Sequence, residues 1–300
     1  MPQTEISQIP PLRRYNIGAA QFEAQTLSPG LHLVATPIGN LGDITVRALA
    51  TLAAADTILC EDTRTTAKLL TRYAIKTRLS PYHEHNAAKV RPHILERLAR
   101  GAAIALVSDA GMPLISDPGY RLVSEAVSQA IPVTACPGPS AVLTGLALSG
   151  LPTDRFAYFG FLPAKAGERK RLYAELTSLP MTLIFFESPH RILGTLGEMA
   201  EGLPGRSFAM TRELTKLHEE VLRGSPAEIA AILGSRESVK GEITLIASPP
   251  SATVTAATDA DILANLATMP AARAAADIAK RFNVAKKDIY ARILALKDHD

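Results

Sequence analysis

LHLVATPIGNLGD, residues 31–43, is the segment that most clearly indicates the fold class of this chain. Its first five residues form a short apolar run of the kind that makes a buried strand. Two glycines, Gly39 and Gly42, follow, and a helix-like stretch comes next. A strand that ends in a glycine loop is typical of parallel α/β sheets, where backbone approaches a ligand at the strand's carboxyl end. The spacing is G-x-x-G rather than G-x-G-x-x-G, which leaves room for a ligand without phosphate.

The alternation of strand and helix continues to about residue 137. Further strands are predicted in the segments 57–60, 102–111 and 132–140, and helices in 44–55, 90–101 and 120–131. This alternation predicts parallel strands joined by right-handed crossovers. Beyond a Pro-Gly-Pro turn the pattern stays α/β, with strands predicted in 155–163, 181–188, 207–214 and 243–248, and helices in 140–150, 168–179 and 191–203.

Composition divides the chain into five parts. We expect a disordered N-terminal extension, two α/β domains, a linker of small polar residues and a helical tail, at 1–29, 30–138, 139–249, 250–258 and 259–300. The extension lacks the apolar core of a signal peptide. The tail has a helix-turn-helix pattern, and a small helical packing unit is the more common meaning of that pattern than DNA reading.

Charge and cysteine content are consistent with several classes of protein. A formal net charge of +3 permits a nucleic-acid partner without requiring one. Cys60 and Cys136 lie in apolar contexts and predict buried thiols rather than a disulfide. No apolar run approaches the roughly 18–20 residues that span a bilayer, so we expect a soluble cytoplasmic protein that does not bind membranes.

Polar clusters follow four of the predicted strands, at 36–40, 61–64, 108–119 and 136–140. Because the carboxyl ends of parallel strands share one edge, these clusters predict a single ligand-binding rim. Asp109 follows its strand directly and could accept a hydrogen bond from a ribose hydroxyl or a ligand ammonium, or could cap a turn.

A second set of residues is suited to an acceptor substrate. His83 and His85 lack an identifiable third ligand, so we expect no metal. Arginines follow two predicted strands of the second domain, and the arginine fork suits phosphate. A basic run at 165–171 suggests either nucleic-acid contact or a solvated helix start.

Several of these segments occur together, in this order, in one known family. They are TPIGNLGDITVRAL, CEDTRTTAKLL, YHEHN, LVSDAGMPLISDPG, CPGPSA, GLPTDRFAYFGFLPAK, FFESPHR and TRELTKLHEE. Over about residues 31–247 the chain resembles the tetrapyrrole (corrin/porphyrin) methylases, the class III S-adenosylmethionine-dependent methyltransferases. The EDTR, SDAG and GFLPAK segments are most similar to the branch that methylates the ribose 2′-hydroxyl of a cytidine in small-subunit ribosomal RNA.

The resemblance implies a homodimer of two-domain chains, with S-adenosylmethionine in the interdomain cleft, that acts on ribosomal RNA or on the assembled small subunit. It assigns to the cofactor Pro37, Ile38, Gly39, Asp109, Gly111, Pro113, Ile115, Ser140, Ala141, Phe186, Met210 and Thr244. It assigns to the transfer Asp62, Arg64, His83, Glu187, Arg212, Glu213 and Lys216. Asp62, His83, Glu187 and Glu213 are all candidate proton acceptors. RNA contacts are expected from Arg64, Asn86, Lys165, Arg169, Lys170, Arg171 and Arg191.

Three other functions have to be weighed against this one. A tetrapyrrole-type methyltransferase would share the cofactor site but would need a roomy apolar cleft. A regulator could bind DNA through the C-terminal helices. A nicotinamide oxidoreductase is disfavoured by the missing dinucleotide fingerprint.

Overall fold

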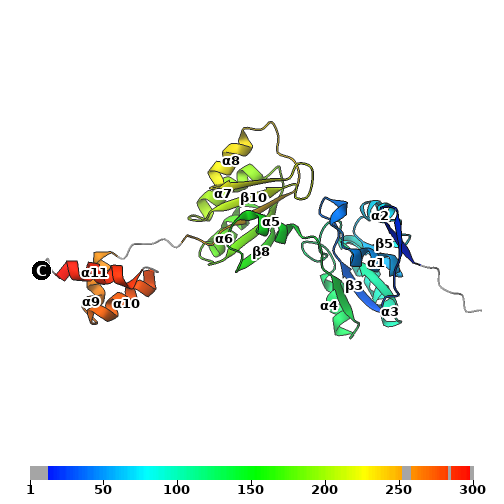
Figure 1. Cartoon of the computed structure of the whole chain (residues 1–300), viewed down its shortest axis with the longest axis horizontal. Helices are drawn as coiled ribbons and strands as arrows, with labels where there is room; N and C mark the ends of the chain where they lie inside the picture. Colours follow the sequence, from blue (N-terminus) through cyan, green and yellow to red (C-terminus); the bar gives the residue numbers. More distant parts are fainter. Residues whose placement is uncertain (1–12, 252–257, 283–284, 298–300) are drawn as a thin grey trace, which may run out of the picture.

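The computed structural model describes residues 13–251, 258–282 and 285–297. Two α/β domains are followed by a group of three helices, which confirms the predicted fold class (Figure 1). The chain passes from the first sheet to the second between Cys136 and Ala141, through the Pro-Gly-Pro turn. No helix within the described ranges is long and apolar enough to cross a membrane.

The first domain is built on a five-stranded parallel sheet. Its strands, in the order β5-β4-β6-β3-β7, are Leu79–Pro81, Thr57–Cys60, Ala103–Leu106, Gly30–Val34 and Val133–Cys136. The predicted parallel topology is therefore confirmed. The helices are α1, α2, α3 and α4, over Val46–Ala54, Thr63–Arg72, Glu84–Ala99 and Tyr120–Ser128.

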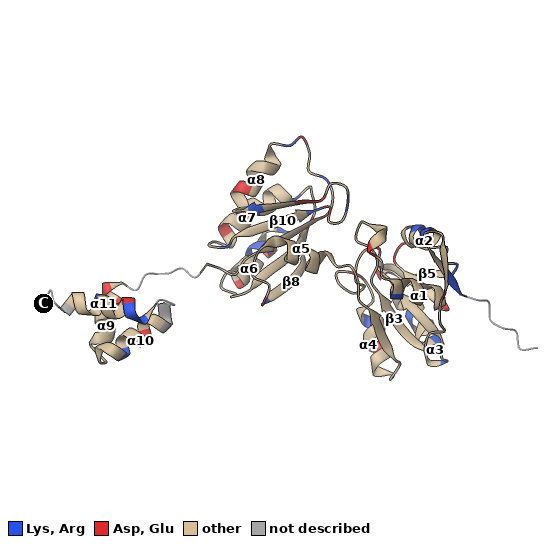
Figure 2. Cartoon of the chain, in the orientation of Figure 1, with Lys and Arg blue, Asp and Glu red and all other residues tan. Residues whose placement is uncertain are grey.

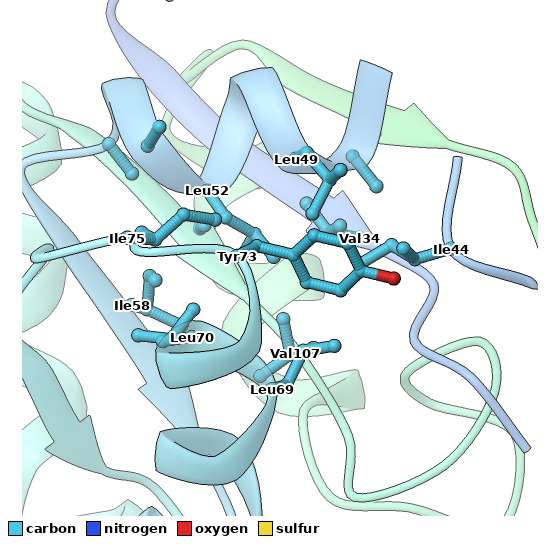
Figure 3. Packing of buried hydrophobic residues seen from close by; sticks show 14 of the residues in the cluster. Val34, Ile44, Leu49, Leu52, Ile58, Leu69, Leu70, Tyr73, Ile75 and Val107 are labelled. Carbon is cyan, nitrogen blue, oxygen red and sulfur yellow. The ribbon is translucent and has the colours of Figure 1, made fainter. Parts of the chain in front are cut away.

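Both faces of this sheet are buried. Successive residues of a strand point to opposite faces, so Ile58 packs with α1 and α2 while Leu59 packs with α3 and α4. Figure 3 shows the first of these clusters, with Leu49 and Leu52 of α1 on one side of Tyr73 and Leu70 of α2 on the other. Burial on both faces explains why these strands read as continuous apolar runs in the sequence.

An N-terminal hairpin lies where we expected a disordered extension, so that expectation is wrong for this part of the chain. Strands β1 (Arg14–Ile17) and β2 (Ala20–Glu23) pair antiparallel, and Tyr15 stacks on Phe22. Tyr15 is buried in the cluster beneath α1. Two four-residue strands carry too short an apolar pattern to predict from sequence. Residues 1–12 of the expected extension lie outside the described ranges.

The second domain has a mixed sheet. In the order β11-β10-β12-β9-β8 its strands are Glu220–Gly224, Phe208–Arg212, Ile243–Ala247, Thr182–Glu187 and Phe156–Phe161. Only β8 and β9 are parallel. One face is covered by α5 (Ala141–Ser149), the other by α6, α7 and α8, over Ala166–Leu176, Ile192–Gly202 and Pro226–Gly234. The polar edge strand β11 and the helix α8 were not predicted.

The tail contains α9, α10 and α11, over Asp259–Leu266, Ala271–Phe282 and Lys286–Lys297. Ile262, Ala274, Ile278, Ile289 and Ile293 form a hydrophobic cluster of their own. The predicted helix-turn-helix corresponds to α10 and α11. Its turn at 283–284, and most of the predicted linker, at 252–257, lie outside the described residues.

Arg206 is a buried charge that stabilises the second domain. The residue is only 5% exposed, and this burial lowers the pKa of its guanidinium. Its terminal nitrogens donate hydrogen bonds to backbone carbonyls of two segments, one at Leu176, Thr177, Leu179 and Met181 and the other at Ser248. A single side chain thus ties the end of α6 to the chain that follows β12.

We expect Arg206→Met to lower the free energy of unfolding by about 3 kcal/mol, because several buried carbonyls lose their only charged donor. Urea-induced unfolding followed by circular dichroism measures the change. Arg171→Met, at an exposed position, is the matched control. Equal unfolding midpoints for the two variants would contradict this role.

Candidate active site

A cavity of about 400 Å³ lies where loops of the two domains meet. The first domain contributes the loops that follow β3, β6 and β7. The second domain contributes the carboxyl ends of β8 and β9 and the start of β12. Its lining includes Ile38, Asp109, Gly111, Ile115, Ser116, Asp117, Ser140, Ala141, Val142, Phe161, Phe186, Glu187, Glu242 and Thr244. Its size falls within the roughly 300–1,000 Å³ of small-molecule sites.

The loop after β6 is fixed to the loop after β3 by backbone contacts. Thr36 and Gly111 exchange two backbone hydrogen bonds, of 2.9 and 3.0 Å. The hydroxyl of Ser108 donates to the carbonyl of Gly111 at 3.2 Å. Gly111 has φ +80°, where a side chain would be strained, and a Cβ there would lie 3.4 Å from Ile38. Glycine therefore allows the two loops to form one wall of the cavity.

Two hydrogen bonds join the domains at the cleft. The hydroxyl groups of Ser116 and Tyr158 lie 2.6 Å apart, and the N–H of Asn40 donates to the hydroxyl of Thr215 at 3.1 Å. Ser116 and Thr215 both have positive φ, of 64° and 65°. Non-glycine residues adopt this conformation at a cost, so the contacts across the cleft hold both loops in strained turns.

The cavity is acidic. Four carboxylates line it and none of its lining residues is Lys or Arg. Burial raises the pKa of Asp117 to about 6, and the nearby charge of Glu61 adds to the effect. Burial also raises the pKa of Asp109, although the N–H of Asp62 donates to its carboxylate and opposes the shift. A cationic ligand without phosphate fits this environment, because it lowers the cost of burying the carboxylates.

Most of the predicted cofactor residues are brought together in this cavity. Those that line it are Ile38, Asp109, Gly111, Ile115, Ser140, Ala141, Phe186 and Thr244. Pro37 and Gly39 line an adjoining cavity instead. Pro113 lines neither. Met210 is fully buried in the hydrophobic core of the second domain, on the sheet face away from α5. The run around Met210 is apolar on both faces, so the sequence alone did not indicate which face it occupies.

Sequence reasoning placed Ser116 and Asp117 in the polar cluster 108–119 of the predicted rim but did not assign them to the cofactor, and it did not assign Phe161 to the site. Asp117 follows a Ser in the same loop as Asp109, and this second Ser-Asp pair was the available signal. Phe161 ends β8, and its ring lies 5.5 Å from that of Phe186. The pairing of β8 with β9, which places these rings together, could not be deduced from the sequence.

Two of the four candidate proton acceptors are kept ionised by a cationic partner. Asp62 caps α2 and binds Arg64 at 2.7 Å, and this pairing lowers the pKa of Asp62 to about 2. The hydrogen bond from Lys216, 2.7 Å long, lowers the pKa of Glu213. Both groups stay ionised at neutral pH and have little tendency to accept a proton.

The other two candidates differ in position. Glu187 lines the cavity, but both of its oxygens accept hydrogen bonds of 2.7 Å, from the N–H of Ser188 and the hydroxyl of Thr195. His83 lies at the N-cap of α3, where its N–H donates to the side chain of Asn86 at 2.9 Å. His83 and Asn86 line neither cavity, and their contacts are those of local structure.

The predicted basic residues do not form one surface. Arg169 binds Glu198 through two hydrogen bonds of 2.6 Å, and Arg212 binds Glu220 at 2.9 Å. Arg191 donates to the carbonyls of 162 and 163. These three arginines fix loops of the second domain, which argues against free phosphate contacts. Lys165, Lys170 and Arg171 are exposed on α6 or its N-cap, and Arg64 is 87% exposed. Figure 2 shows Lys and Arg in both domains and in the C-terminal helices.

The family model of the tetrapyrrole (corrin/porphyrin) methylases matches residues 30–230. "Ribosomal RNA small subunit methyltransferase I" of Mesorhizobium japonicum is 48% identical over 285 residues, 94% of this chain and 97% of that protein. The protein of the same name from Erythrobacter litoralis is 48% identical over 276 residues, covering 91% and 98%.

Solved structures share the fold at low sequence identity. A diphthine synthase matches with a TM-score of 0.58 and 13% identity, covering 73% of this chain and 89% of that one. The methyltransferase CobJ matches with a TM-score of 0.56 and 18% identity, covering 75% and 95%.

This chain belongs to the tetrapyrrole (corrin/porphyrin) methylase family. It is a methyltransferase, and S-adenosylmethionine is its methyl donor. The acidic lining of the cavity, which includes no Lys or Arg, fits that cofactor, whose sulfonium and ammonium groups are both cationic. Aromatic and aliphatic walls at Phe161, Phe186 and Val142 suit its apolar parts.

The raised pKa of Asp117 predicts that cofactor binding depends on pH. Its carboxylate is mostly protonated below pH 6 and ionised above it, and only the ionised form attracts a cation. Affinity for S-adenosylmethionine should therefore rise from pH 5 to 7 and level off above pH 7. The total rise should be about tenfold for each unit by which bound cofactor lowers the pKa of Asp117. Isothermal titration calorimetry measures this rise, and Asp117→Asn should flatten it. An equally steep rise in the variant would assign the titration to another group.

Proposed function

We propose that this protein transfers the methyl group of S-adenosylmethionine to the ribose 2′-hydroxyl of a cytidine in small-subunit ribosomal RNA. The observation that carries the proposal is the 48% identity to proteins named as small-subunit ribosomal RNA methyltransferases, which extends over 94% of the chain and so reaches beyond the two α/β domains. A cavity suited to a cationic methyl donor supports it. We expect the protein to act in the cytoplasm, with the ribosomal subunits that it would modify.

The residues of this chain would act chiefly by positioning. When bound, S-adenosylmethionine supplies a methyl group already activated on a sulfonium sulfur. The apolar side chains of Ile38, Ile115 and Phe186 would exclude water and fix its orientation for in-line attack. Correct orientation of two reactants is worth up to roughly 7–11 kcal/mol. The carboxylates of Asp109 and Asp117 would offset the positive charge of the donor.

We also propose that the protein is a homodimer. β7 pairs with β3 on one side only, so its other edge can accept a partner. Beside it, α4 presents Tyr120 and Val127, 73% and 61% exposed, seven residues apart on one helix face. Exposed apolar side chains next to an open strand edge suit burial against a second copy of the chain.

The proposed reaction predicts a chemically distinctive product. With labelled S-adenosylmethionine and small ribosomal subunits, the label should enter RNA, and the adjacent phosphodiester should resist alkali because its 2′-oxygen is blocked. Alkaline hydrolysis followed by mass spectrometry locates the methyl group. A methyl group on a base, or on a tetrapyrrole offered as a competing substrate, would contradict the proposed acceptor while leaving the methyltransferase assignment intact.

The C-terminal helices are expected to aid docking on RNA. A chain truncated after Ser251 retains both domains and every residue that lines the cofactor cavity. It should bind S-adenosylmethionine with unchanged affinity but methylate ribosomal subunits more slowly, because it lacks exposed cations such as Lys286 and Lys287. Full activity on subunits would contradict a docking role, and loss of cofactor binding would indicate that the tail stabilises the domains.

A further inference from the structure

A second cavity, of about 310 Å³, adjoins the cofactor cavity. Ile38, Asp109, Ala110 and Glu242 line both, so the two cavities share a wall. The remaining lining comes from the loop after β3, from one face of α2, and from the segment that follows β10, at Thr36, Pro37, Gly39, Leu41, Thr65, Thr66, Lys68, Leu69, Ser108 and Lys216. Residues of both domains therefore enclose a second space beside the methyl donor.

The two cavities differ in charge. The cofactor cavity is lined by four carboxylates and no Lys or Arg, whereas the second cavity is lined by Lys68 and Lys216 together with the two shared carboxylates, Asp109 and Glu242. Lys216 binds Glu213 and Glu242, at 2.7 and 3.1 Å. Within the described part of the chain, no hydrogen bond or ion pair is found for Lys68, which is exposed. An exposed lysine without a partner, at the mouth of a cavity, suits a phosphate group of a polynucleotide.

Helix α2 adds to this preference for an anion. Its first turn carries Thr65 into the lining of the cavity, and Arg64, 87% exposed, lies on the same turn. Lys68 lies one turn further along. Residues four positions apart share a helix face, and because Arg64 is paired with Asp62 at 2.7 Å, Lys68 is the cation of this face that is left for a phosphate.

We propose that the second cavity holds the acceptor nucleoside of the RNA, with Lys68 on a flanking phosphate and the ribose 2′-hydroxyl against Asp109. This inference rests on the proposed function, since it takes RNA as the substrate. Asp109 is suited to the role because it lines both cavities and so lies between donor and acceptor.

The proton balance of the transfer is complete with Asp109 as the acceptor. The 2′-hydroxyl gives its proton to the Asp109 carboxylate, and its oxygen forms a bond to the methyl carbon. The carbon–sulfur bond breaks with its electron pair on sulfur, which yields S-adenosylhomocysteine, the methylated ribose and a protonated Asp109. Burial raises the pKa of Asp109, so it is a better base than Asp62, whose pKa is about 2.

The first test removes the phosphate contact. Lys68→Ala should raise the KM for ribosomal subunits at least about fivefold, and the slope of log affinity against log salt should fall by about 0.7–0.9, as expected for one lost phosphate contact. Lys68→Arg should restore most of the affinity. The control is Lys76→Ala, at an exposed lysine that lines neither cavity and should leave both values unchanged. Calorimetry should give the same affinity for S-adenosylmethionine in every variant.

The second test fills the cavity and removes the base. Thr65→Trp should abolish transfer to RNA while S-adenosylmethionine still binds, which also shows that the variant folds. Asp109→Asn should slow single-turnover transfer at saturating cofactor by about 100-fold or more, the usual contribution of a positioned base. A loss of cofactor affinity in the Thr65 or Lys68 variants would overturn the inference, because the second cavity would then hold part of the cofactor. Unchanged RNA kinetics in both would overturn it as well.

The inference can fail separately from the proposed function. If the wild-type protein methylates ribosomal RNA but the Lys68 and Thr65 variants do so equally well, the acceptor binds elsewhere and the proposed function stands. If the wild-type protein transfers no methyl group to RNA, the proposed function is refuted, and this acceptor site with it.

Discussion

The pair of backbone hydrogen bonds between Thr36 and Gly111 is the contact on which the site depends. It fixes the loops after two neighbouring parallel strands, β3 and β6, into one rigid wall. Parallel strands bring these loops to the same edge but do not by themselves lock them together. The positive φ of Gly111 makes the close approach possible, and the hydroxyl of Ser108 adds a further hydrogen bond to the same carbonyl. Asp109, which lies between Ser108 and Gly111 in the chain, is thereby held where both cavities meet.

The placement of charge is the second constraint. Four carboxylates line the larger cavity, where burial raises the pKa of Asp109 and Asp117, whereas the smaller cavity combines two of these carboxylates with two lysines. Elsewhere in the molecule several arginines are paired with a carboxylate, as Arg169 is with Glu198. Such pairing stabilises loops and removes those cations from contact with a ligand. The cations left for RNA are therefore fewer than the count in the sequence suggests.

Much of the site could be predicted because its residues follow strands. The apolar runs before Thr36 and Asp109 are recognisable, and the carboxyl ends of parallel strands must share an edge. Eight of the twelve predicted cofactor residues line the cavity for this reason. The predicted residues that lie elsewhere have a different origin. Met210 lies within a strand that is apolar on both faces, and Arg169, Arg191 and Arg212 have partners that are distant in sequence.

The sequence by itself determined which segments of the first domain form buried strands, where the glycine loops lie, that the dinucleotide fingerprint is missing, and which family the chain resembles. Each of these depends on residues close together in the chain. Tertiary structure alone decided which carboxylates are buried and which are paired. The pKa of Asp62 is low and that of Asp117 is high, although Asp62 follows β4 and Asp117 lies in the loop after β6, a neighbouring strand of the same sheet. The difference arises because Arg64 binds Asp62, whereas the folding of the loop after β6 places Asp117 away from water and near Glu61. Desolvation and charge proximity depend on the packed arrangement of distant segments, which no local pattern in the sequence records.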